Sequence, residues 1–208
     1  MVTCRPYQAL CPLMNLPNRL TLARILLSPV FMGLILIEDS RAKLAALIVF
    51  VIAALTDLGD GYFARRRGLA TGFGKFMDPL ADKILTSTAF ISFVALGYAR
   101  GWMVTVIVAR EFFLTGFRSL AAYRGILIAP TLGARLKTVL QMVTIAVILL
   151  HVYLKSVLVP HGFHWAIFES GTTQIVFDWL MGANVLMTVA TGLDYLVRHF
   201  ALLKNVVK

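Results

Sequence analysis

Charged residues are scarce in this chain. They make up 14% of its 208 residues, and 59% of the residues are hydrophobic. A soluble domain of this size carries about 25% charged residues, so the composition argues against a soluble globular fold. The apolar runs are long enough to cross a hydrocarbon core of roughly 30 Å. The sequence therefore predicts an all-α integral membrane protein.

Cysteine is almost absent, and acidic residues are half as numerous as basic ones. Cys4 and Cys11 both lie in the N-terminal arm, and without partners elsewhere they define neither a zinc site nor a disulfide framework. The formal net charge is +10. Because the basic residues gather at the ends of apolar runs, the expected partners are a membrane surface and anionic substrates, not nucleic acid.

Linkers, internal repeats and low-complexity segments are also missing. We predict a single transmembrane catalytic domain over residues 1–208, with an N-terminal arm and interfacial segment at 1–19 and a six-helix bundle at 20–200. Arg19 and Arg24 interrupt the approach to the first apolar run, and no small-residue cleavage site follows it. A retained first helix is therefore expected in place of a signal peptide.

Six apolar runs fit membrane-spanning helices. The predicted spans are 20–37, 44–64, 79–98, 102–122, 136–158 and 173–196. Before the first span, M-N-L-P-N-R at 14–19 is interpreted as a short interfacial segment, with a small amphipathic helix as one form of it.

The distribution of lysine and arginine predicts the orientation of these spans. One side collects Arg5, Arg19, Arg24, Arg65, Arg66, Arg67, Lys75, Arg118, Arg124, Arg135, Lys137, Arg198, Lys204 and Lys208. The other side has only Arg41, Lys43, Arg100 and Lys155. Positive residues favour the cytoplasmic side, so both termini and the loops after the second and fourth spans are predicted to be cytoplasmic.

The longest loop on the opposite side, at 159–172, contains two histidines and a tryptophan. His161 and His164 could ligate a metal, but with Trp165 beside them an interfacial loop with an aromatic anchor is the favoured interpretation.

Four carboxylates, Asp57, Asp60, Asp78 and Asp82, lie in or against the second and third spans. An ionised carboxylate in a bilayer costs several kcal/mol unless it is paired. Asp57 and Asp60 share one helix face, as do Asp78 and Asp82, and the short intervening loop predicts antiparallel neighbours whose acidic faces meet. Oxygen-only ligands favour Mg²⁺, Mn²⁺ or Ca²⁺ over zinc, and four acids suffice for two ions.

Small residues and an arginine accompany these acids. Gly61, Ala64 and Gly74 would leave a groove for a ligand, and Arg65 would pair with a phosphate at its rim. Structural alternatives exist for single residues. Asp78 before Pro79 could cap a helix, the glycines could serve helix packing, and the run from Arg65 to Arg67 could be a topological anchor.

The spacing Asp-x-x-Asp-Gly-x-x-Ala-Arg, eight residues, then Gly-x-x-x-Asp-x-x-x-Asp resembles the signature of the CDP-alcohol phosphotransferase family. The matching positions are Asp57, Asp60, Gly61, Ala64, Arg65, Gly74, Asp78 and Asp82. The resemblance implies six transmembrane helices, usually in a homodimer, with a polar cavity open to the cytoplasm. It also implies transfer of a phosphatidyl or related group from a CDP-linked donor to an alcohol, with release of CMP.

The same resemblance implies roles for these residues. Asp57, Asp60 and Asp78 would hold two divalent cations, Mg²⁺ or Mn²⁺, on the donor's diphosphate. Asp82 would be the general base and a further metal contact. The CDP pocket would be lined by Asn18, Gly61, Ala64, Arg65, Thr71 and Gly74.

Further runs narrow the resemblance to the bacterial branch that makes phosphatidylglycerophosphate from CDP-diacylglycerol and sn-glycerol 3-phosphate. They are N-L-P-N-R-L-T-L-A-R, G-K-F-M-D-P-L-A-D-K, A-R-E at 109–111 and L-K-T-V-L-Q-M at 136–142. This branch implies a location in the bacterial inner membrane. Arg135 stands where the branch usually has lysine, which keeps the charge, and Ser119 where it usually has glutamate.

Basic residues on the fourth and fifth spans suit such an acceptor. A phosphomonoester carries nearly two negative charges, and Arg110, Arg118, Arg135 and Lys137 are predicted to bind it. Topological anchoring, or a simple pair between Arg110 and Glu111, is the alternative for single residues. Lys83 is interpreted as a snorkelling anchor.

Two other functions fit parts of the pattern. One is the same chemistry with another acceptor, such as inositol phosphate or serine. The other is a cation or proton transporter that uses the acids as its pathway. Transporter sites tend to lie near the bilayer midplane between repeated halves. Here the acids cluster near one end of two adjacent helices and no repeat is visible, so an enzyme is favoured.

Overall fold

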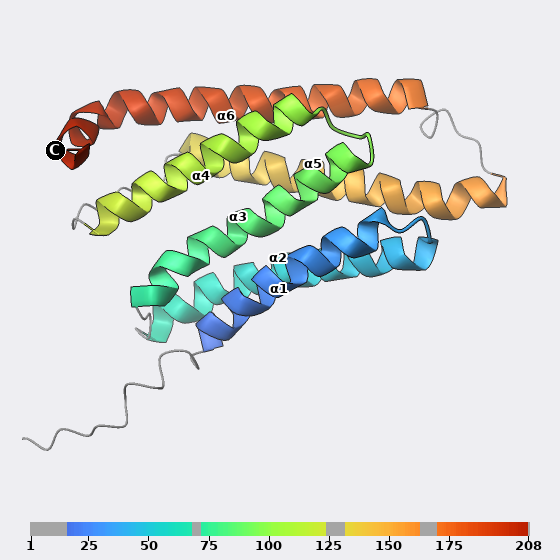
Figure 1. Ribbon diagram of the computed structural model, residues 1–208, viewed down its shortest axis with the longest axis horizontal. Helices are drawn as coiled ribbons and strands as arrows, with labels where there is room; N and C mark the ends of the chain where they lie inside the picture. Colours follow the sequence, from blue (N-terminus) through green and yellow to red (C-terminus); the bar gives the residue numbers. More distant parts are fainter. Residues whose placement is uncertain (1–15, 68–71, 124–131, 163–169, 208) are drawn as a thin grey trace, which may run out of the picture.

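The structure, a computed structural model, describes residues 16–67, 72–123, 132–162 and 170–207. All regular secondary structure within these ranges is helical (Figure 1). The helices are α1 (Leu16–Leu36), α2 (Ser40–Arg67), α3 (Gly72–Ala95), α4 (Gly101–Tyr123), α5 (Leu132–Leu158), the short 3₁₀ helix η2 (Val159–His161) and α6 (Ser170–Val207).

The long helices form one bundle with their axes roughly along the same direction (Figure 1). α1 packs along both α2 and α3, α4 packs on α3 and α6, and α5 contacts α2, α3 and α6. Side chains from all six meet in a continuous apolar core that includes Phe31, Phe50, Phe90, Ile107, Ile148 and Met181. This core fixes the positions of α3, α4 and α5, which carry the pocket described below.

The predicted six helices agree with the described ones in number and order, but some details differ. Residues 16–19 of the expected interfacial segment form the start of α1 in place of a separate helix. Pro17 is tolerated there because the backbone N–H groups of a helix's first turn have no intrahelical partners, so the missing N–H of proline costs no hydrogen bond. α6 continues to Val207, past the predicted end at 196.

The predicted contact between the second and third helices is limited in the described part of the chain. α1 packs extensively on both α2 and α3, whereas these two touch each other much less. Consecutive antiparallel helices are usually neighbours, but here the apolar faces of α2 and α3 are both covered by α1.

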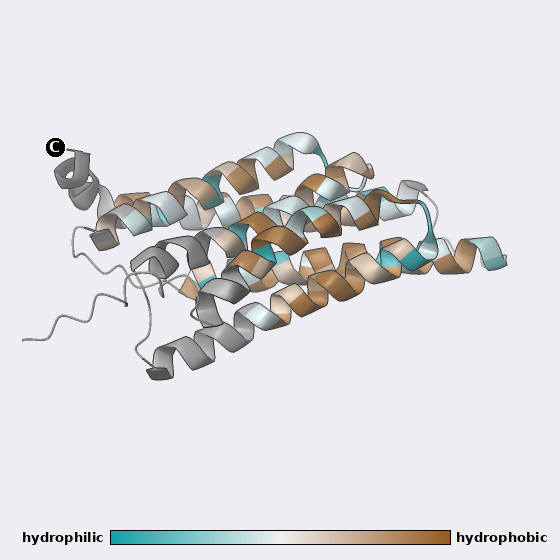
Figure 2. Ribbon diagram, turned by 60° about the horizontal axis from the view of Figure 1, so that its bottom comes forward, coloured by the Kyte–Doolittle hydropathy of each residue, from teal (hydrophilic) through white to brown (hydrophobic). Residues whose placement is uncertain are grey.

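Within the described ranges, two segments, Leu132–His161 and Gly171–Val197, are long and apolar enough to cross a membrane. Leu22–Leu36 and Lys83–Ala95 are shorter apolar stretches. Large apolar side chains are exposed on the outside of the bundle, among them Leu26 at 61% and Trp179 at 78%. Figure 2 shows hydrophobic residues along much of the length of the described helices. Soluble monomers rarely expose contiguous apolar surface, so this exterior suits a membrane protein. Six spans and a cytoplasmic orientation stay predictions.

The turn between α3 and α4 closes one end of the bundle. Gly97, with a φ of 77°, ends α3, and the N–H of Tyr98 bonds to the carbonyl of Phe93 at 2.8 Å. This is a Schellman cap, which needs the left-handed conformation that glycine adopts without strain. Beyond it, Arg100 Nε donates to both carboxylate oxygens of Asp178 on α6, at 3.0 and 3.1 Å. These hydrogen bonds, with the charge attraction, raise the pKa of Arg100.

The same end carries part of the loop predicted to hold two histidines. His161 ends η2, is exposed, and its Nδ1 lies 2.7 Å from the carbonyl oxygen of Val157. His164 and Trp165 lie outside the described residues. The metal-ligating alternative for this loop is therefore an open prediction.

Candidate active site

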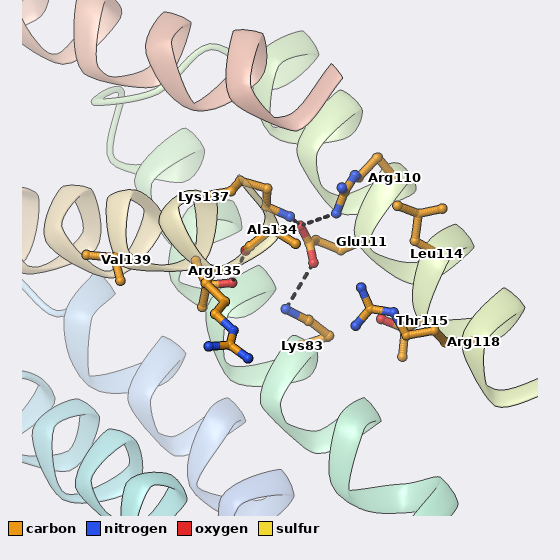
Figure 3. A pocket seen from close by; sticks show the side chains of 11 residues that line it. Lys83, Arg110, Glu111, Leu114, Thr115, Arg118, Ala134, Arg135, Lys137 and Val139 are labelled. Carbon is orange, nitrogen blue, oxygen red and sulfur yellow. Dashed lines mark hydrogen bonds and ion pairs between the residues drawn. The ribbon is translucent and has the colours of Figure 1, made fainter. Parts of the chain in front are cut away.

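The four residues predicted to bind an acceptor phosphate line one pocket. Arg110 and Arg118 come from α4, and Arg135 and Lys137 from α5. Lys83 of α3 joins them, and the pocket measures about 320 Å³ (Figure 3). The other lining residues are Glu111, Leu114, Thr115, Ala134, Thr138 and Val139.

Glu111 lies at the centre of this cluster and is the one acidic residue among the lining side chains that the structure describes. Its Oε1 pairs with the ammonium of Lys137, and its Oε2 lies 2.9 Å from the Nζ of Lys83. Arg110 Nη1 approaches Oε1 at 3.5 Å, so the pairing of neighbours that was one alternative for Arg110 does occur, but weakly. A buried charge needs such partners, and Glu111 is only 5% exposed.

The pocket is strongly positive. Among the lining side chains that the structure describes, five are cationic and one is a carboxylate, so their formal net charge is +4. In Figure 3 the guanidinium groups of Arg118 and Arg135 lie on either side of Lys83, away from the Glu111 carboxylate. A cleft lined by one sign of charge concentrates ligands of the other sign. The arrangement suits a small dianion such as a phosphomonoester.

α6 supports the pocket from behind. Arg110 Nη2 donates a hydrogen bond to Thr191 Oγ1 at 2.9 Å. A Cβ placed on Gly192 would meet Arg110 Nε at 3.4 Å, so the glycine lets the arginine lie close against α6. The Arg118 guanidinium lies 5.7 Å from the ring centroid of Tyr195, within cation–π range.

Buried polar residues on α5 and α6 form hydrogen bonds to Glu111 and to each other. Lys137, Gln141 and Thr144 recur at helical spacing on α5, and all three are buried. Gln141 Nε2 donates to Glu111 Oε1 at 3.5 Å, and Asn184 Nδ2 of α6 donates to Thr144 Oγ1 at 2.7 Å. Residues three and four apart share a helix face, so the sequence spacing contained a signal for Gln141 that we did not use.

Lys83 differs from its sequence-based interpretation as a snorkelling anchor. Its ammonium turns inward to a buried carboxylate instead of outward to the interface. Its place on α3, one residue after Asp82, sets the basic pocket beside the part of α3 that carries the family motif. Thr191, which supports Arg110 from α6, was not indicated by any pattern in the sequence.

The residues of the acidic motif lie on the helices as follows. α2 carries Asp57, Asp60, Gly61, Ala64 and Arg65; α3 carries Gly74, Asp78 and Asp82; and α1 carries Asn18. Their side chains are outside the described set, and Thr71 lies outside the described residues altogether. The predicted metal and CDP sites therefore stay predictions.

The chemistry of the donor set nevertheless fits the metals that the motif implies. Four carboxylates with no histidine or cysteine in the same stretch are hard oxygen ligands, which suit Mg²⁺ or Mn²⁺. Among the side chains that the structure describes, no group of three or more His, Cys, Asp or Glu comes together elsewhere. The motif on α2 and α3 is therefore kept as the candidate metal site.

A helical bundle with a cationic pocket beside a motif of four aspartates suits an enzyme that acts on phosphate groups. The sequence profile described as CDP-alcohol phosphatidyltransferase matches residues 14–193, and the chain belongs to this family. This confirms the resemblance seen in the sequence, and the transporter alternative loses its support.

Curated relatives within the family carry names for the same activity. The CDP-diacylglycerol–glycerol-3-phosphate 3-phosphatidyltransferase of Bacillus subtilis is 39% identical over 203 residues, which cover 92% of this chain and 98% of the relative. The probable phosphatidylglycerophosphate synthase of Mycobacterium tuberculosis is 35% identical and covers 88% of this chain and 81% of its own. A 3-phosphatidyltransferase of Rickettsia typhi with the same name as the Bacillus protein is 39% identical over 65% of this chain and 76% of its own.

Proposed function

We propose that this protein transfers the phosphatidyl group of CDP-diacylglycerol to sn-glycerol 3-phosphate, giving phosphatidylglycerophosphate and CMP. The observation that carries the proposal is the convergence of five basic side chains from three helices on one pocket. The names of the Bacillus and Mycobacterium relatives, which match most of this chain, support it.

The pocket would bind the acceptor through its phosphate. Arg118 and Arg135 offer planar guanidinium groups that can donate two parallel hydrogen bonds to phosphate oxygens. Arg110 and Lys137, deeper in the site, add positive charge. Serine has no phosphate and would leave this charge uncompensated. Inositol phosphate carries the same dianion and is the alternative acceptor.

The acidic motif would hold the donor. Asp57, Asp60, Asp78 and Asp82 are the proposed ligands of two divalent cations, Mg²⁺ or Mn²⁺. When bound, these ions would neutralise the diphosphate and stabilise charge on the departing CMP. Asn18, Gly61, Ala64, Arg65, Thr71 and Gly74 are the proposed CDP contacts.

The reaction exchanges one phosphorus–oxygen bond for another. A hydroxyl oxygen of glycerol 3-phosphate attacks the phosphorus that carries the diacylglycerol. The bond from this phosphorus to the bridging oxygen of CMP breaks, and CMP leaves with that oxygen. The hydroxyl proton passes to the carboxylate of Asp82, the proposed general base. Lys83 follows Asp82 on α3, which supports a base that lies next to the acceptor pocket.

Placement in the membrane follows the same proposal. All six long helices would span the bacterial inner membrane, with the termini and the active site on the cytoplasmic side, where nucleotide-linked donors are found. A homodimer within the bilayer is the proposed assembly. Cysteines introduced one at a time at Glu38 and at Lys204 would test the orientation by their reactivity with a membrane-impermeant thiol reagent.

The activity is tested by CMP release from CDP-diacylglycerol by the purified protein in mixed micelles with Mg²⁺. Glycerol 3-phosphate, inositol phosphate and serine are compared as acceptors, and the lipid product is identified by mass spectrometry. We expect phosphatidylglycerophosphate from the first and little product from the others. CMP release that is absent with glycerol 3-phosphate but present with another acceptor would reject the proposal.

A further inference from the structure

The Glu111 carboxylate joins two lysines that differ in their access to the pocket. Oε1 is occupied by the ammonium of Lys137, whose side chain is 2% exposed, and by Gln141 Nε2 at 3.5 Å. Oε2 lies 2.9 Å from the Nζ of Lys83, whose side chain is 21% exposed. Oε1 is therefore bound by buried side chains, whereas Oε2 binds the Lys83 ammonium at the pocket.

The buried side of this arrangement is fixed from several helices. Lys137 and Gln141 reach Glu111 from α5, and Arg110, the residue before it on α4, is itself held by Thr191 of α6. A carboxylate with partners on both oxygens has little freedom to turn. Its second oxygen therefore keeps a defined position toward α3.

We propose that Glu111 is a positioning residue that holds the Lys83 ammonium in place for the acceptor phosphate, and that Lys83 is a further specificity-determining residue. This inference rests on the proposed function. In Figure 3 Lys83 projects between Arg118 and Arg135 into the same space. An ammonium there completes a three-sided cationic site with the two guanidinium groups.

Positioning matters because of the length of the lysine side chain. Lysine loses more rotamer freedom than most residues when it is fixed. A lysine already held by Glu111 loses less on binding the acceptor, so the acceptor binds more tightly. Glu111 also lowers the positive charge of the pocket, which works in the opposite direction. The two effects predict opposite changes in KM when the carboxylate is removed, so measurement can separate them.

The test is a double-mutant cycle on the purified protein, with KM measured separately for glycerol 3-phosphate and for CDP-diacylglycerol. We expect Lys83→Met to raise KM for glycerol 3-phosphate about tenfold, through loss of one charge-assisted hydrogen bond. Glu111→Gln should raise it about fivefold by removing the carboxylate that holds the Lys83 ammonium, and the double variant should match Lys83→Met alone. KM for CDP-diacylglycerol and the Mg²⁺ requirement should stay unchanged.

The matched control is Lys155→Met. It removes a lysine from the far end of α5, where the ammonium lies 5.8 Å from the centroid of the Tyr98 ring and outside the pocket. Its KM for glycerol 3-phosphate should equal that of the wild type. If Glu111→Gln does not fold, Glu111→Asp keeps the charge but retracts it from Lys83. We expect a smaller rise in KM from Glu111→Asp, and none in the Lys83→Met background.

Each outcome decides the matter. Effects of Lys83→Met and Glu111→Gln that multiply, or a KM that falls in Glu111→Gln, would overturn the positioning role. An unchanged KM in Lys83→Met would overturn the specificity role. Absence of CMP release by the wild type with glycerol 3-phosphate would instead reject the proposed function itself, so the two failures are distinguishable.

Discussion

Lys137 on α5 pairs with Glu111 on α4, and both side chains are almost entirely inside the bundle. The two residues join the helices that form opposite walls of the basic pocket. Breaking a buried pair by removing one partner leaves the other charge uncompensated, which typically costs about 3–5 kcal/mol. The ion pair therefore links the stability of the bundle to the shape of its acceptor site.

Removal of either partner should lower stability, but to different extents. Glu111→Gln leaves Lys137, Lys83 and Arg110 without their shared anion, so we expect a loss of about 3–5 kcal/mol. Lys137→Met should cost less, because Lys83 and Arg110 still accompany the carboxylate. The unfolding temperature of each variant, measured in detergent micelles, shows which variant is less stable. A lower unfolding temperature for Lys137→Met than for Glu111→Gln would contradict it.

Arg135 and Arg118 should govern the affinity for the acceptor. We expect Arg118→Gln or Arg135→Gln to raise KM for glycerol 3-phosphate by about 10- to 100-fold, the effect of a lost charge-assisted contact. Arg135→Lys keeps the charge and should change KM for glycerol 3-phosphate much less. Steady-state kinetics with saturating CDP-diacylglycerol measure KM in each variant, with Lys155→Met as the control. Equal losses in Arg135→Lys and Arg135→Gln would show that charge is not what matters at this position.

Thr191 should act on the acceptor site from α6. Thr191→Val has nearly the same shape but cannot accept the hydrogen bond from Arg110 Nη2, which spans 2.9 Å. Because Arg110 then loses one of its fixed contacts, we expect a rise of about threefold to tenfold in KM for glycerol 3-phosphate. Thr191→Ser, which keeps the hydroxyl, should behave as the wild type. A similar loss in both variants would point to packing instead of the hydrogen bond.

The aspartate motif should be required for metal-dependent turnover. Chelation by EDTA should abolish CMP release, and Mg²⁺ or Mn²⁺ should restore it. Asp57→Asn, Asp60→Asn and Asp78→Asn should each lose activity and need more metal. Asp82→Asn should lower kcat by about 100-fold or more through loss of the base. Full activity of Asp82→Asn at saturating metal would remove Asp82 from the catalytic role.

Much of this molecule is predictable from local pattern. Apolar runs of helical length give the six long helices, and the motif from Asp57 to Asp82 gives the family. The grouping of Arg118, Arg135 and Lys137 also followed from the sequence, because these residues lie near the adjoining ends of α4 and α5. Arg110, midway along α4, was singled out as an ionisable residue within a span. These features depend on spacing along one helix or between two consecutive ones.

The remaining features depend on how distant helices cross, which spacing does not encode. Lys83 turns toward Glu111 because α3 and α4 pack together, and Thr191 reaches Arg110 from 81 positions away. In the described part of the chain, α1 covers both α2 and α3, and these two contact each other much less than consecutive helices usually do. In each case the packing of helices far apart in the chain determines which residues are in contact, and the local sequence pattern does not.

We propose above all that the basic pocket selects an acceptor by its phosphate. The most direct measurement compares kcat/KM for glycerol 3-phosphate with that for glycerol, which has the same carbon skeleton without the phosphate. It is made in the wild type and in the double variant Arg118→Gln, Arg135→Gln. We predict a large preference for glycerol 3-phosphate in the wild type that falls by about 100-fold or more in the variant. A preference that survives the loss of both arginines would contradict the account.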